Sequence, residues 1–96
     1  MELSFNLENI DLREFWGVNN KNFRFLETIF PHLELTERSE KLLVCGEEKD
    51  LRDFETFFNN LIIAYENQTY IDEKIIMSVL QQNEYFKNKE EEVLVY

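Results

Sequence analysis

Residues 15–25 read FWGVNNKNFRF, and this stretch decides how the first third of the chain is organised. Gly17 is placed to end a very short helix over residues 11–16, because glycine readily adopts the left-handed conformation that terminates a helix. Apolar residues at helical spacing predict a second helix over residues 20–30. The sequence therefore predicts a short loop, GVNN at residues 17–20, between two helices.

The two predicted helices carry their own start and stop signals. Asp11 followed by Glu14 forms a capping-box-like start for the first helix. The second helix ends before Pro31, and its apolar stripe consists of Phe23, Leu26 and Phe30.

Three strands are predicted around these helices. Residues 3–7 alternate apolar and polar side chains, which is typical of a half-buried strand. Residues 33–36 and 41–45 form a second and third strand around the polar turn ERSE, so we expect an antiparallel pair. Leu33 and Leu35 would face one side of this pair, with the polar residues between them on the other side.

The second half of the chain is mainly helical in pattern. Residues 47–65 give the strongest helical signal, with acids in the first turn and an apolar stripe of Leu51, Phe54, Phe58, Leu61, Ile62 and Tyr65. After the connector ENQTY, residues 72–82 predict a further helix, with Ile75, Ile76, Val79 and Leu80 inward. Residues 84–96 are predicted to be a charged linker that ends in the strand-like segment EVLVY.

Length and composition define the class of protein. A chain of 96 residues with 44% hydrophobic content and only two glycines and one proline is most simply one globular domain, here residues 1–83. The formal net charge of -10 repels phosphate backbones and anionic membranes as a whole. The single cysteine rules out an internal disulfide, and no membrane span or signal peptide is visible, so we expect a cytoplasmic protein.

The residues that could support catalysis or bind metal have simpler explanations. His32 stands alone without a partner at a metal-binding or catalytic spacing, and Cys45 alternates with apolar neighbours, as a small core residue would. The acids at 47, 48 and 50 sit at a helix start, where capping explains them. No phosphate-binding loop is present. We therefore expect no enzyme activity, no cofactor and no metal in this chain.

The order strand, helix, loop, helix, strand, strand, helix resembles a type I KH domain, in which a GxxG loop between two helices clamps the backbone of RNA. The loop here is GVNN, with Gly17 at the first position and Asn20 where the second glycine belongs. The resemblance implies an α+β fold of the order β-α-α-β-β-α, followed here by an extra helix and a trailing strand.

A closer resemblance covers nearly the whole chain. It rests on NIDLREFWGVNNKNFRFLETIFPHLEL, the strand LLVCG, the helix LRDFETFFNNLIIAY and the segment IDEKIIMSVL. Together they resemble the N-terminal domain of the phosphate-starvation-inducible PhoH-like family, in which a small KH-like domain precedes a P-loop ATPase. The resemblance implies that ATP and magnesium belong to a domain that would follow residue 96, and that EVLVY leads towards it.

Two hypotheses for function remain open. In the first, the chain presents single-stranded RNA to the ATPase domain, using a site made of Gly17, Asn19, Asn20, Lys21, Asn22 and Arg24. Residues 16–26 carry Lys21 and Arg24 and no acid, in an otherwise acidic chain. In the alternative, the chain is a protein-interaction or self-association module that keeps the KH-like shape without binding RNA. The net charge and Asn20 favour this alternative.

Overall fold

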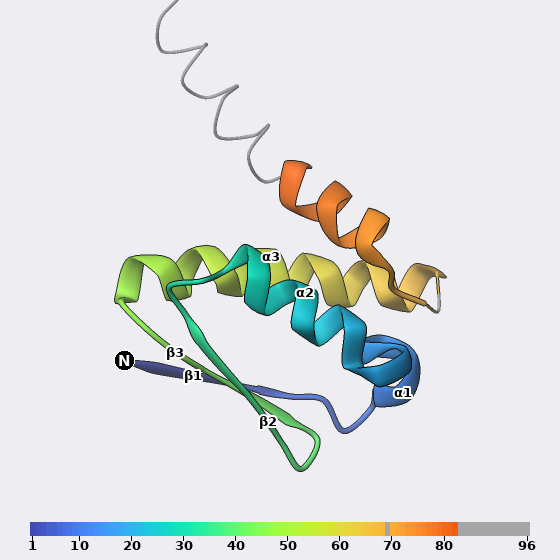
Figure 1. Cartoon of the computed structure of the whole chain (residues 1–96), viewed down its shortest axis with the longest axis horizontal. Coiled ribbons are helices and arrows are strands. Elements are labelled where there is room, and N and C mark those ends of the chain that lie inside the picture. The colour runs from blue at the N-terminus through green and yellow to red at the C-terminus, as the bar shows by residue number, and fades with distance from the viewer. Residues whose placement is uncertain (69, 83–96) are drawn as a thin grey trace, which may run out of the picture.

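The computed structural model describes residues 1–68 and 70–82, and it has the α+β architecture that the sequence predicts (Figure 1). The helices of this part lie on one side of a three-stranded antiparallel sheet of order β1-β3-β2. In chain order the elements are β1 (Glu2–Asn6), α1 (Leu12–Trp16), the 3-10 turn η1 (Val18–Asn20), α2 (Lys21–Ile29), β2 (Glu34–Arg38), β3 (Lys41–Cys45), α3 (Glu48–Gln68) and a helix over residues 73–82.

The β2–β3 hairpin is confirmed, with a tighter turn than the sequence suggested. Arg38 pairs directly with Lys41, so only Ser39 and Glu40 form the turn. Both have positive φ, 45° and 55°, which is the backbone of the two-residue turns that match the twist of a hairpin. Strand β2 is therefore two residues longer at its C-terminal end than predicted.

Strand β1 begins and ends one residue earlier than predicted. Its last pair is Asn6 with Lys41, whereas Leu7 is just outside the ladder and its N–H donates to the carbonyl of Glu40. The predicted alternation is correct, because Leu3 and Phe5 pack against the core and Leu7 is buried.

Cys45 does not occupy the core position that the sequence suggested. It pairs with Glu2 on one side and Glu34 on the other, and all three side chains point away from the helices. The thiol donates a hydrogen bond of 3.4 Å to Oε2 of Glu2. This hydrogen bond is the main reason that the pKa of Cys45 is raised, and partial burial and the charges of Glu2 and Glu34 raise it further. The predicted core position of Cys45 is therefore wrong by one residue, since Leu42 and Val44 face the core.

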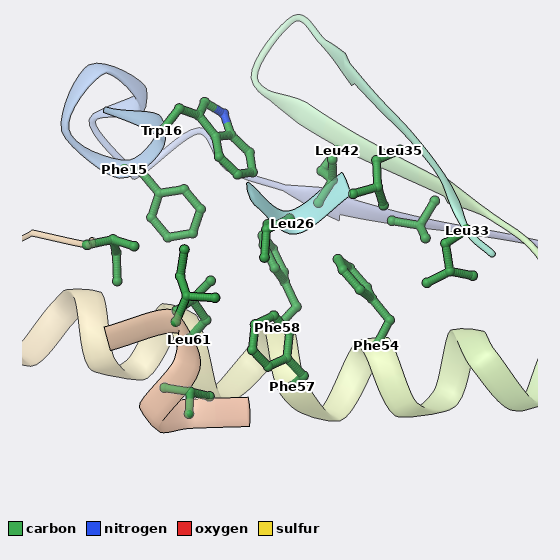
Figure 2. Close-up of a cluster of buried hydrophobic side chains, with 14 of the residues drawn as sticks. Phe15, Trp16, Leu26, Leu33, Leu35, Leu42, Phe54, Phe57, Phe58 and Leu61 are labelled. Carbon is green, nitrogen blue, oxygen red and sulfur yellow. The ribbon is translucent and has the colours of Figure 1, made fainter. Parts of the chain in front are cut away.

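Helix α3 is the central element of the hydrophobic core. It begins at Glu48 and runs to Gln68, three residues past its predicted end, so the predicted connector ENQTY lies largely within the helix. Figure 2 shows Phe54, Phe57, Phe58 and Leu61 of α3 together with Phe15, Trp16 and Leu26. Phe57 was not predicted as a core residue, yet it is only 1% exposed and contacts the ring of Phe30.

The helix over residues 73–82 lies against α3 on the side away from the sheet (Figure 1). Asp72 caps it, since its Oδ1 accepts a hydrogen bond of 2.8 Å from the N–H of Ile75. Ile76 and Val79 are buried as predicted. The predicted linker and EVLVY strand of residues 84–96 lie outside the described residues.

None of the helices in residues 1–68 and 70–82 is long and apolar enough to cross a membrane.

The hairpin turn yields a stability prediction. Ser39 and Glu40 hold left-handed backbone that asparagine and glycine adopt more readily. We expect the double variant S39N/E40G to unfold at a higher temperature, by about 4–8 °C for a gain of about 1 kcal/mol. Circular dichroism melting would measure this. Glu37→Gly, one residue before the end of β2, should instead lower the melting temperature, and an equal or lower value for S39N/E40G would contradict the prediction.

Candidate nucleic-acid interface

The GVNN loop (residues 17–20) is held at its first residue by a conformation that only glycine adopts readily. Gly17 has φ 79° and ψ 179°, and its N–H donates to the carbonyl of Arg13, which closes the last turn of α1. A Cβ on Gly17 would lie 3.2 Å from Cγ of Lys21 and 3.2 Å from Nδ2 of Asn22. The predicted helix stop is therefore confirmed, and the side chain of Lys21 runs back over Gly17.

The other three loop residues project into solvent. Val18 is 76% exposed, and Asn19 and Asn20 are exposed with left-handed backbone, φ 56° and 55°. Asparagine tolerates this conformation better than most residues, so Asn20 forms the turn without the second glycine of a GxxG loop. The exposure of Val18 is a feature that sequence reasoning missed, although an apolar residue between glycine and asparagine in a loop is a signal for it.

Helix α2 begins directly after this loop with an open N-terminus. Asn20 is its N-cap residue, but the Asn20 side chain makes no capping hydrogen bond, and the first turn contains no acidic residue. Asn20 is therefore not the side-chain cap that asparagine often provides at this position. The backbone N–H of Lys21 donates to the carbonyl of Val18 in η1. The N–H groups that follow it in the first turn lack partners within the helix, and an anion near them would be stabilised.

Lys21 and Arg24 lie three residues apart on α2, so they are neighbours on the helix surface. Both are exposed, and neither forms an ion pair within residues 1–68 and 70–82. The two cations are therefore available to an external partner, next to the exposed loop.

Asn22 must be removed from the predicted site, because its side chain is inside the protein. It is 1% exposed, and its Nδ2 donates hydrogen bonds of 2.9 Å to the carbonyls of Phe15 and Ile71. The helical turn directs residue 22 inward, while residues 21 and 24 face solvent. Sequence reasoning treated the asparagines of this stretch alike, although the apolar positions 23 and 26 place residue 22 on the buried side.

Five of the six predicted site residues thus gather at one end of α2: Gly17, Asn19, Asn20, Lys21 and Arg24. His32 is exposed. No group of three His, Cys, Asp or Glu residues in the described part of the chain could hold a metal ion.

Comparisons of the chain with protein-family models, with curated proteins and with solved structures find no match.

Asn22 gives a prediction about how the loop is held. Asn22→Leu would leave the carbonyls of Phe15 and Ile71 without their buried donor, which costs roughly 1–3 kcal/mol for each unpaired group. We therefore expect urea unfolding to show a loss of about 2–4 kcal/mol.

The control is Asn59→Leu, the same substitution at an exposed position of α3, which should change stability by less than about 0.5 kcal/mol. Equal unfolding midpoints for the two variants would mean that the hydrogen bonds of Asn22 to Phe15 and Ile71 do not stabilise the fold.

Proposed function

We propose that this chain is an RNA-binding accessory domain that holds the backbone of single-stranded RNA at the GVNN loop. The observation that carries the proposal is the exposed left-handed loop, which leads directly into the N-terminus of α2. This N-terminus has no side-chain cap and lies beside two cations that form no ion pair within the described residues. Phosphate groups bind to such helix N-termini and to lysine and arginine side chains. The position of the loop between two helices is that of the GxxG loop in KH domains.

Each residue of the site has a distinct role in this proposal. Gly17 provides the turn that presents the loop, because its φ of 79° is one that residues with a Cβ rarely adopt. Lys21 and Arg24 pair with successive phosphates, while the exposed amides of Asn19 and Asn20 donate hydrogen bonds to phosphate oxygens or base edges.

The resemblance to the PhoH-like family supports a wider proposal. In it, residues 1–83 form an accessory domain, residues 84–96 lead towards an ATPase domain, and ATP and magnesium bind to that domain. The chain itself would then act without catalysis, by presenting RNA to the ATPase.

A second candidate function is a protein-interaction module without RNA binding. The formal net charge of -10 favours it, and so does Asn20, whose side chain stands where the GxxG loop of a KH domain has glycine. The loop contacts RNA in the first candidate function and does not in the second. Substitutions in the loop therefore distinguish the two.

The first test reverses the two cations. We expect wild type to bind a short single-stranded RNA weakly at low salt, with affinity falling about 7-fold between 50 and 200 mM salt if two phosphates are neutralised. The variant K21E/R24E should lose this binding. Fluorescence anisotropy of a labelled oligonucleotide would measure both.

The matched control is K49E/K74E, which makes the same change in net charge at exposed positions of α3 and the last helix. It should retain most of the affinity, because salt screens charges that lie more than about 10 Å away at 0.1 M ionic strength, which is within the range tested. Equal binding by wild type and K21E/R24E would exclude the loop as an RNA site and favour the interaction module.

The second test restores the glycine of the GxxG pattern. Because Asn20 makes no capping hydrogen bond and has φ 55°, Asn20→Gly should leave the melting temperature unchanged or slightly raised. RNA affinity should increase, since the backbone can approach more closely. Asn67→Gly, at an exposed helical position of α3, serves as the control and should only lower stability. Unchanged affinity in Asn20→Gly would contradict a contact at residue 20.

A further inference from the structure

The sheet has an outer face that points away from the helices of Figure 1. Direct cross-strand pairing arranges its side chains in three rows across β1, β3 and β2. We call them the acidic row, the middle row and the basic row. In this order they consist of Glu2, Cys45 and Glu34, then Ser4, Leu43 and Thr36, then Asn6, Lys41 and Arg38.

Opposite charges occupy opposite ends of this face. The acidic row carries two carboxylates and the basic row carries two cations, with the uncharged middle row between them. Adjacent rows are two residues apart along each strand, so the charged rows are about 13 Å apart. Glu34, Lys41 and Arg38 are exposed and form no ion pair within the described residues.

We propose that the outer face binds the outer face of a second copy of this chain, as a two-fold dimer. The two-fold axis would lie between the two sheets and run perpendicular to the strands. This rotation places the acidic row of each copy over the basic row of the other, and the two middle rows over each other. Glu34 would then face Arg38 of the second copy, with Lys41 of the second copy within reach of Glu2, and each contact would occur twice.

The charges select this arrangement over the alternative. A two-fold axis parallel to the strands would place acid on acid and base on base, which is repulsive. The outer face is thus complementary to itself in one orientation. The half-buried Leu43 at its centre is the apolar residue that the two copies would cover together.

The size of the outer face determines how strongly the two copies are expected to bind. Five residues along three strands cover about 17 Å by about 14 Å, or about 240 Å². This is well below the roughly 800 Å² per partner of a stable complex, and the net charge of -10 adds repulsion. We therefore expect a weak, transient dimer at chain concentrations on the order of 1 mM.

The test exchanges charges between the rows. Sedimentation equilibrium at 0.15 M salt should show a concentration-dependent increase in mass for wild type. E2K/E34K makes both charged rows basic and R38E/K41E makes both acidic, so each alone should remain monomeric. An equimolar mixture of the two should associate again, because every charged row then meets its opposite.

The control pair is E55K/E66K with K49E/K74E, which changes net charge equally at exposed positions of the helices. These two variants should each associate as wild type does, and melting curves should confirm that every variant is folded. A wild type that stays monomeric at 2 mM would overturn the proposal. So would variants E2K/E34K and R38E/K41E that associate singly, or whose mixture does not. The K21E/R24E variant should still dimerise, so this result is separate from that of the RNA test.

Discussion

The ring of Phe58 joins strand β1 and helix α1 to helix α3. Its centroid lies 4.8 Å from that of Phe5 on β1, 5.8 Å from Phe15 and 6.5 Å from Trp16 on α1, and 5.4 Å from Phe54. Helix α1 has only five residues, too few to be stable alone in water. Its position therefore depends on these aromatic contacts, and so does the position of the GVNN loop that follows it.

A single buried polar side chain completes this support within the described residues. The aromatic contacts fix α1 on α3, and the amide of Asn22 then fixes the end of α1 to α2 and to the segment before the last helix. The GVNN loop is thus anchored on both sides, at Gly17 by α1 and at Lys21 by α2. A loop held in this way loses less conformational entropy when it binds a ligand than a free loop would.

Local signals in the sequence predicted the elements and much of the candidate site. Gly17 could be recognised as a helix stop because its position needs a backbone that other residues avoid, and Asp72 at the start of the last helix is a cap of ordinary type. The sequence predicts the position of the turn at Ser39 and Glu40 correctly, but it predicts a longer turn than the structure has. Neither residue is typical of a tight turn, so the hairpin ladder rather than the turn sequence determines its length.

The errors concern which way a side chain points, because this depends on contacts between distant elements. Cys45 follows three apolar residues, and only its pairing with Glu2 and Glu34 shows that it lies on the outer face. Asn22 is buried because the carbonyl of Ile71, 49 residues away, meets its amide. Phe57 is a different kind of omission, since its spacing from Phe54 and Leu61 already places it beside the apolar stripe, and Phe30, just after α2, packs against it. For Cys45 and Asn22, the spacing of apolar residues cannot reveal the distant partner.

The net charge of the chain is a poor guide to its surface, because acids and bases are segregated. Acids occupy the first turn of α3, whereas the first turn of α2 has none and carries Lys21. At physiological salt, charges beyond about 8 Å are largely screened, so an approaching phosphate responds mainly to the nearest groups. The same reasoning applies to the outer face, whose two charged rows are farther apart than this length. In both proposals a region attracts a partner that the molecule as a whole repels, so both attractions are expected to weaken as salt concentration rises.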